Sequence, residues 1–233
     1  MYLAPLRLLA MEVRDRLVAQ GIPCNLLTGE EHDRMEGARH TACTVEMMNP
    51  AQEVEVAVID EIQMLQDPGR GWAWTSALVG APARDVYVCG ADPVHRRCVE
   101  VLDAIGERHE TVFLERKTPL VLEDTPLGSR RGRKQSEAGL QPGDAVIAFS
   151  RKDVLTLSAR YRAQGLSVAT IYGALAPEVR RTESERFASG EADVVVATDA
   201  IGMGLNLPVR RTIFSTVHKF DGVEVRPLNA VEV

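Results

Sequence analysis

The chain has 233 residues, 45% of them hydrophobic and 26% charged, and a formal net charge of −6. This composition is typical of a globular protein, and no apolar run approaches the ~20 residues that cross a bilayer, which disfavours a membrane protein. The acidic balance also disfavours a protein that coats nucleic acid with its whole surface, although it leaves room for a local basic groove. The length favours two modest domains over one large one.

The first half alternates helical patterns with short apolar runs. Apolar residues at three- and four-residue steps predict a helix from about Pro5 to Gln20, with no secretory signal in front of it. The runs that predict strands lie at 24–27, 55–59, 86–89 and 111–114, and further helices are predicted at 72–78 and 93–105. Such alternation indicates an α/β fold with a largely parallel sheet.

The alternation stops between Lys117 and Gly143, where a polar and basic stretch is bracketed by prolines and glycines. We interpret 117–143 as a connection between a first domain, 1–116, and a second, 144–233; a surface hairpin within one domain is the alternative. The basic residues of this stretch could contact phosphate, although a charged run in a connection is more often only solvated: Arg130, Arg131, Arg133 and Lys134.

The second half resumes the alternation. Strands are predicted at 144–149, 167–171, 193–197 and 211–214, and helices at 154–163 and 177–187. The two halves share no convincing sequence identity, so any repetition is one of topology only.

The four cysteines form no Cys-x-x-Cys pair, and we predict that they are buried, reduced thiols. Two sets could in principle bind zinc, but neither has a recognised ligand spacing. These sets are His32, His40 and Cys43, and Cys89, His95 and Cys98.

Two carboxylates, Asp60 and Glu61, directly follow the apolar run Val56–Ile59. In open α/β sheets ligands bind at the carboxyl ends of strands, so these acids could face a bound nucleotide. Asp60 would be the metal ligand and would act through water, because Mg²⁺ usually retains several waters. Glu61 would orient and deprotonate an attacking water. The pair alone is weak support, because acids also favour helix N-termini for electrostatic reasons.

A second strand, Val194–Ala197, ends at Thr198 and Asp199 and is followed by Gly202 and Gly204. Glycines allow the backbone to approach a phosphate or sugar, and the two polar side chains supply a donor and an acceptor. A glycine-rich turn after a strand is common, but its combination with an earlier Asp-Glu strand end is far more specific.

This combination resembles superfamily 2 helicases, in which an Asp-Glu motif of one RecA-like domain and an Ala-Thr-Asp motif of the next serve one ATP. The segments Asp60–Met64 and Arg70–Thr75 resemble more closely the suppressor-of-var type, the ATP-dependent RNA helicases of the mitochondrial degradosome and their bacterial relatives. Further segments agree in the same order: 4–10, 27–31, 43–47, 149–153, 171–173 and 197–207.

The resemblance implies two RecA-like parallel-sheet domains in tandem, ATP and Mg²⁺ as cofactors, and single-stranded or duplex RNA as the partner. It implies an exoribonuclease as a second partner, and a mitochondrial location in a eukaryote or a cytoplasmic one in a bacterium. Residue by residue, it implies ATP binding by Asp60, Glu61, Asp199 and Gly202, RNA binding by Pro5, Arg7, Thr28, Gly29, Thr44, Ser150 and Thr198, and coupling of the two by Gln63, Cys89 and Gly90.

Several of these residues also have simpler interpretations. Pro5 can begin a helix, where its missing N–H costs nothing, and Arg7 can be an ordinary solvated side chain. Thr28 and Gly29 can form an ordinary turn. Trp72 and Trp74 could stack on bases, but their surroundings favour a packed helix.

The sequence contains no Gly-x-x-x-x-Gly-Lys-Ser/Thr loop to hold the phosphates of ATP and no Gly-Arg-x-Gly-Arg segment to supply a charge-stabilising arginine. We expect both to lie outside these residues, the first domain to lack its phosphate-loop strand, and the chain alone to be inactive as an ATPase. The predicted function is ATP-dependent RNA unwinding. The alternatives are a non-catalytic RNA-binding module derived from such a helicase and an unrelated α/β nucleotide enzyme.

Overall fold

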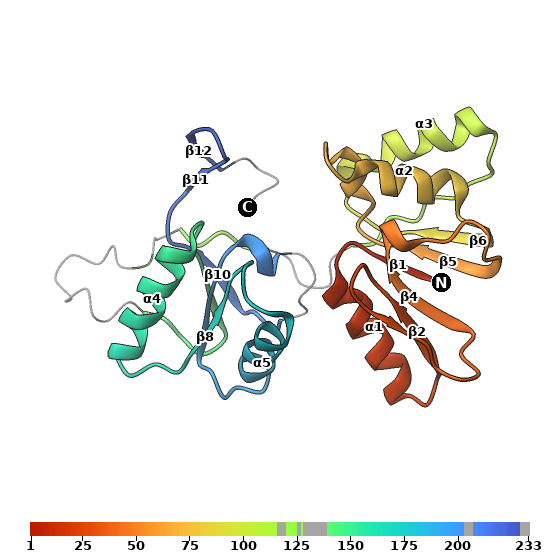
Figure 1. Cartoon of the computed structure of the whole chain (residues 1–233). Helices are drawn as coiled ribbons and strands as arrows, with labels where there is room; N and C mark the ends of the chain where they lie inside the picture. The colour runs from red at the N-terminus through yellow and green to blue at the C-terminus, as the bar shows by residue number, and fades with distance from the viewer. Residues whose placement is uncertain (116–119, 125–126, 128–138, 203–206, 229–233) are drawn as a thin grey trace. The chain divides into compact units, whose positions relative to one another are not determined.

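The computed structural model describes residues 1–115, 120–124, 127, 139–202 and 207–228, and the chain divides into two units, Met1–Arg116 and Lys117–Val233 (Figure 1). Most of the predicted connection 117–143, including its basic residues 130, 131, 133 and 134, lies outside the described residues. Each unit is α/β, as the alternation predicted.

The first unit is built on a six-stranded sheet with the order β3-β2-β4-β1-β5-β6 (Figure 1). All neighbouring strands are parallel except β3, which runs antiparallel to β2. The strands are β1 Tyr2–Ala4, β2 Cys24–Leu27, β3 His32–Asp33, β4 His40–Thr44, β5 Val54–Ile59 and β6 Ala83–Val88.

Two cores cover the two faces of this sheet, because successive side chains of a strand point to opposite sides. Ala4 of β1 packs with Ala10 of helix α1 (Arg7–Ala19), whereas its neighbour Leu3 packs with Trp74 of helix α2 (Gly71–Gly80) and Cys98 of helix α3 (His95–Ile105). Helix α3 ends at Gly106, whose φ of 76° is the left-handed conformation that commonly closes a helix.

The second unit has a four-stranded parallel sheet with the order β10-β7-β9-β8. Its strands are β7 Asp144–Ile147, β8 Val168–Ile171, β9 Val194–Ala197 and β10 Arg211–Phe214. Val194 and Val196 of β9 belong to a core with Val154 and Tyr161 of helix α4 (Arg151–Ala163). The alternate residues of β9 belong to a second core with helix α5 (Pro177–Ala188), so β9 is buried on both faces.

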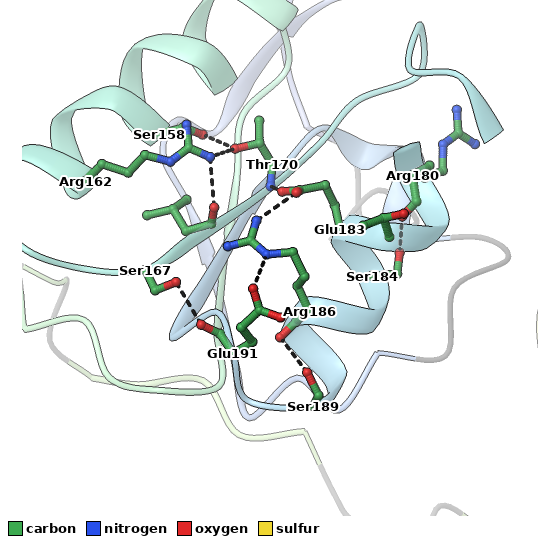
Figure 2. Close-up of polar contacts among 12 residues, drawn as sticks. Ser158, Arg162, Ser167, Thr170, Arg180, Glu183, Ser184, Arg186, Ser189 and Glu191 are labelled. Carbon is green, nitrogen blue, oxygen red and sulfur yellow. Dashed lines mark hydrogen bonds and ion pairs between the residues drawn. The ribbon is translucent and has the colours of Figure 1, made fainter. Parts of the chain in front are cut away.

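The outer edge of β8 is covered by side chains of the flanking helices, as Figure 2 shows. The backbone N–H of Thr170 donates to Oε2 of Glu183 on α5 at 2.7 Å, and the carbonyl of Val168 accepts from Arg162 on α4 at 2.8 Å. Arg186 in turn lies 2.8 Å from the other oxygen of Glu183. An open strand edge can pair with another chain, and these side chains occupy two of its hydrogen-bonding groups.

Three sequence predictions were wrong. Residues 111–114 form no strand, and Val112, Phe113 and Leu114 are 69%, 69% and 89% exposed, because the segment pairs with no described strand. Cys89 is exposed, since it follows the outermost strand of its sheet, although the other three cysteines are buried thiols as predicted. Trp72 is 63% exposed, whereas Trp74 is fully buried.

Five further strands were not predicted from the sequence. These are β1, β3, β4 and the two strands of an antiparallel hairpin, β11 His218–Phe220 and β12 Val225–Pro227. Among the described residues, no helix is long and apolar enough to cross a membrane, and no three His, Cys, Asp or Glu side chains are grouped as metal ligands.

Candidate nucleotide and RNA site

The candidate residues of the first unit lie at one edge of its sheet. Strands β1, β2, β4, β5 and β6 are parallel, so their carboxyl ends meet along this edge. Each of these strands ends at a candidate segment. In the order of the strands just given, the segments begin at Pro5, Thr28, Thr44, Asp60 and Cys89. The topology therefore brings together residues that are up to 85 positions apart, counting from 5 to 90.

Asp60 is held in place through its side chain and its backbone. Its Oδ2 accepts a hydrogen bond from the hydroxyl of Tyr2 at 2.6 Å, and its Oδ1 accepts one from the N–H of Glu61 at 2.9 Å. Its carbonyl accepts from the indole of Trp74 at 2.9 Å, and its N–H donates to Leu3 at 3.1 Å. The carboxylate therefore has a fixed orientation at the end of β5.

Glu61 is the one described non-glycine residue with a positive φ, 52°, and its ψ is 49°. This left-handed conformation costs roughly 1–2 kcal/mol for a residue with a Cβ, and such strain often accompanies functional sites. Its side chain accepts a hydrogen bond from Nε2 of Gln63. The turn thus directs Glu61 away from the path of the strand and holds its carboxylate beside Gln63.

Gln63 also contacts the segment that follows β6. Its Oε1 accepts from the N–H of Ala91 at 3.1 Å, and the N–H of Ile62 donates to the carbonyl of Cys89 at 2.9 Å. A Cβ added at Gly90 would lie 2.6 Å from Ile62 and 2.7 Å from Gln63, so only glycine fits there without a shift. The three residues predicted to couple the sites are therefore packed together.

A surface hollow at the same edge of the sheet gathers four of the five RNA-binding residues predicted in this unit, Pro5, Arg7, Gly29 and Thr44. Its remaining lining residues are Leu6, Glu46, Met47 and Arg70. The hollow thus has two arginines in its wall, together with backbone from the ends of β1, β2 and β4.

Thr28, the fifth residue, does not line the hollow. It is fully buried, and its hydroxyl accepts from the N–H of Glu31 at 3.0 Å and bonds the Glu31 carboxylate at 3.2 Å. Thr28 therefore shapes the turn that carries Gly29. The same turn supplies two partners for Arg7, which is paired with Glu30 and lies 3.0 Å from Glu31.

The candidates of the second unit also lie at strand ends. Ser150 follows β7 and caps helix α4, since its Oγ accepts from the N–H of Asp153 at 3.0 Å. Thr198 follows β9, and its N–H donates to Ile171 at 3.0 Å.

Asp199 is exposed and lies 3.4 Å from the ammonium of Lys219, on β11. The N–H of Gly202 donates to the carbonyl of Asp199 at 2.9 Å, which closes the turn after β9. Gly204 lies outside the described residues.

The residues around Asp60 suit a hydrated Mg²⁺. This ion prefers oxygen ligands and usually binds through one or two carboxylates while it keeps several waters. The Asp60 carboxylate is half-buried, and each of its oxygens accepts one hydrogen bond, which leaves a further lone pair on each.

No role was predicted from the sequence for Tyr2, Glu46 or Arg70. Arg70 belongs to a segment that carries the family resemblance, and this was the signal that could have identified it. Glu46 likewise belongs to such a segment, 43–47. Tyr2 gave no such signal, because its contact depends on the pairing of strands that are distant in sequence.

Comparison with known proteins agrees with this geometry. A family model for the DEXQ-box helicase domain of Suv3 matches residues 1–113, and one for the helicase conserved C-terminal domain matches residues 135–222. The mitochondrial ATP-dependent RNA helicase SUPV3L1 of Mus musculus is 44% identical over 224 residues, which are 94% of this chain and 28% of that protein. The mitochondrial ATP-dependent RNA helicase SUV3 of Saccharomyces cerevisiae is 42% identical over 238 residues, which are 100% of this chain and 32% of that protein.

Solved structures show the same fold. S. cerevisiae Dbp5 bound to RNA and ADP BeF3 matches with a TM-score of 0.65 and 18% identity, over 94% of this chain and 63% of that one. The Mycobacterium smegmatis helicase Lhr bound to ssDNA and AMP-PNP matches with a TM-score of 0.63 and 17% identity, over 93% of this chain and 36% of that one. The predicted RecA-like architecture is thereby confirmed.

The chain spans about 30% of the length of these curated relatives. Both helicase domain models match it in the expected order, and the likeness to the relatives extends over nearly all of its residues. The chain belongs to the suppressor-of-var (Suv3) family of superfamily 2 helicases.

Proposed function

We propose that the chain supplies the catalytic carboxylates and much of the RNA-binding surface of an ATP-dependent RNA helicase. One observation carries this proposal: Asp60 and Glu61 follow β5 at the same edge of the sheet as a hollow lined by Pro5, Arg7 and Thr44, which stand at the ends of the neighbouring strands β1 and β4. Gln63 contacts both Glu61 and the segment after β6. A nucleotide site and an RNA site would then share one edge of one sheet.

Asp60 would hold Mg²⁺, which supplies positive charge for the phosphates of ATP. Glu61 would orient the attacking water and accept its proton. Asp199 and Gly202 of the second unit would contribute to nucleotide binding, since they form the turn at the end of β9. Residues 1–116 and 144–233 would be the two helicase domains, with 117–143 as their connection.

RNA would be bound in the first unit by Pro5, Arg7, Gly29 and Thr44, with Thr28 shaping the turn. Ser150 and Thr198 would bind it in the second unit, where both stand at the ends of neighbouring strands. Backbone groups and an arginine can contact the phosphates of any RNA, so we expect binding that is nearly independent of RNA sequence. Gln63, Cys89 and Gly90 would link RNA binding to the state of the nucleotide.

The strand that carries a phosphate-binding loop is expected beside β6, whose outer edge pairs with no described strand. Val86, Tyr87 and Val88 on β6 are 40%, 61% and 37% exposed, which is a large exposure for the apolar side chains of a parallel strand. The proposal further includes an exoribonuclease partner and, in a eukaryote, a mitochondrial location. The location is supported by the two curated relatives, which are both named as mitochondrial helicases.

The RNA-binding part of this proposal is tested by titrating the chain with two single-stranded RNAs of equal length and different sequence at several salt concentrations. Similar affinities are expected, falling with salt, and each neutralised phosphate adds about −0.7 to the log–log slope. Arg7→Gln should weaken binding and make the salt slope about 0.7 shallower. Arg96→Gln, at an exposed position of α3, should change neither the affinity nor the slope. A strong preference for one sequence, or equal effects of the two substitutions, would contradict the proposal.

A further inference from the structure

The guanidinium of Arg70 joins three segments that are distant in sequence. Its Nε donates to Oε1 of Glu46 at 2.7 Å, and its Nη2 donates to the carbonyl of Pro5 at 2.6 Å. Its Cζ lies 5.2 Å from the ring centroid of Trp74, which is fully buried and itself bonds the carbonyl of Asp60. One side chain thus connects the ends of β1, β4 and β5.

The backbone at Arg70 is held in position independently of these side-chain contacts. Oδ1 of Asp67 accepts from the N–H of Gly69 at 2.9 Å and from that of Arg70 at 2.8 Å, which closes the turn in front of α2. A Cβ added at Gly71 would lie 2.4 Å from the carbonyl oxygen of Leu65, so this position admits no side chain without a shift. The turn is therefore tightly constrained on both sides of Arg70.

Arg70, Glu46 and Pro5 all line the hollow. Two of the guanidinium nitrogens of Arg70 are engaged with the protein, which directs the side chain toward the wall of the hollow. Glu46 by itself would repel a phosphate, but its pairing with Arg70 offsets this charge. The contribution of the pair to the hollow is therefore one of shape more than of net positive charge.

We propose that Arg70 is a positioning residue for RNA: through Glu46 and the carbonyl of Pro5 it holds two walls of the hollow in the shape that binds the RNA backbone. This inference rests on the proposed function of the hollow. Lysine cannot take this role, because its single ammonium lacks the planar fork of donors with which Arg70 reaches both acceptors.

The substitution Glu46→Ala distinguishes positioning from direct contact by the sign of its effect. If Arg70 contacts phosphate and Glu46 only competes for it, removing the carboxylate frees the arginine and strengthens RNA binding. If Arg70 acts through Glu46, the same substitution weakens RNA binding even though it removes a negative charge. Glu46→Gln keeps an oxygen acceptor of similar size, so it should restore much of the affinity that Glu46→Ala loses.

The experiment measures the affinity of the 233-residue chain for a single-stranded RNA, with unfolding midpoints as a check on folding. Glu46→Ala and Arg70→Lys should each weaken binding roughly tenfold, and the double variant should lose little more than either. The salt slope should stay unchanged in Arg70→Lys, and the matched controls Glu100→Ala and Arg96→Lys, on α3, should bind like the wild-type chain.

Binding by Glu46→Ala that equals or exceeds that of the wild-type chain would overturn the positioning role and leave the proposed function intact. Equal losses in Glu46→Ala and Glu46→Gln would also overturn it, because an oxygen acceptor at position 46 would then not restore the shape of the hollow. A wild-type chain that binds no RNA would overturn the proposed function and the role of Arg70 together.

Discussion

The hydroxyl of Tyr2 donates a hydrogen bond to Oδ2 of Asp60 at 2.6 Å, between the neighbouring strands β1 and β5. Burial, and then the hydrogen bond to Asp60, hold the pKa of Tyr2 far above its ordinary value. The phenol therefore remains a donor at physiological pH. A proposed Mg²⁺ ligand thus has a partner that fixes its orientation.

Removing the hydroxyl of Tyr2 should raise the Mg²⁺ concentration that ATP hydrolysis requires. In a chimera in which this chain replaces the segment that it matches in the mouse relative, Tyr2→Phe should raise the Mg²⁺ concentration for half-maximal ATPase roughly tenfold, since partners of metal ligands commonly have effects of this size. Tyr161→Phe, on α4 in the second unit, is the matched control. An unchanged Mg²⁺ dependence in Tyr2→Phe would show that Asp60 needs no such support.

The raised pKa of Tyr2 also predicts a pH dependence of stability. The unfolded chain releases the phenolic proton near pH 10, while the folded chain retains it above that pH. The stabilisation by Tyr2 is therefore complete below about pH 10 and declines as the pH rises further. The difference in the free energy of unfolding between the wild-type chain and Tyr2→Phe, measured with urea, should shrink above about pH 10. A constant difference would contradict this.

The left-handed backbone at Glu61 predicts an unusual order of stability among variants. Glu61→Ala and Glu61→Gly both remove the carboxylate, but only glycine adopts a φ near 52° without steric cost. Glu61→Gly should therefore be more stable to urea than Glu61→Ala by about 1 kcal/mol. The reverse order would indicate that the turn relaxes in the variants and stores no strain.

Glu183 covers the edge of β8 and Glu185 does not. We therefore predict that replacing Glu183 by alanine destabilises the fold more than replacing Glu185, although both lie on α5. Glu183→Ala leaves the N–H of Thr170 without its carboxylate partner, and the loss of such a hydrogen bond costs about 1–3 kcal/mol. Glu185 is 64% exposed and pairs with Arg181 on the same helix, so Glu185→Ala should cost far less. The unfolding midpoints of the two variants measure this difference in stability, and light scattering measures association through the uncovered edge. Equal midpoints would contradict the prediction.

Much of the fold could be predicted from the sequence because local patterns determine it. The apolar run of β9, the helical spacing of α1 and the turn residues around them identify these elements without reference to the rest of the chain. Strands β1 and β4 could not be predicted in this way. Strand β1 has only three residues, and β4 presents the small side chains Ala42 and Cys43 to the core. Both strands are stabilised by pairing with segments distant in sequence.

The candidate site was predictable to a similar extent. Asp60 and Glu61 were found because a strand ends at them, and the resemblance supplied residues such as Pro5 and Thr44. The supports of these residues were not found, because the bond from Tyr2 to Asp60 spans 58 positions and that from Arg70 to Pro5 spans 65. Contacts at this separation follow from strand order, which no local pattern contains.

The role of Glu61 in hydrolysis is tested by the RNA-stimulated ATPase rate of the chimera with Glu61→Gln, measured together with its affinity for ATP. Glu61 would activate water without holding the nucleotide, so the rate should fall at least ~10²-fold, while the affinity changes little. Near-normal turnover in Glu61→Gln would contradict the account, because the carboxylate at the end of β5 would then have no part in hydrolysis.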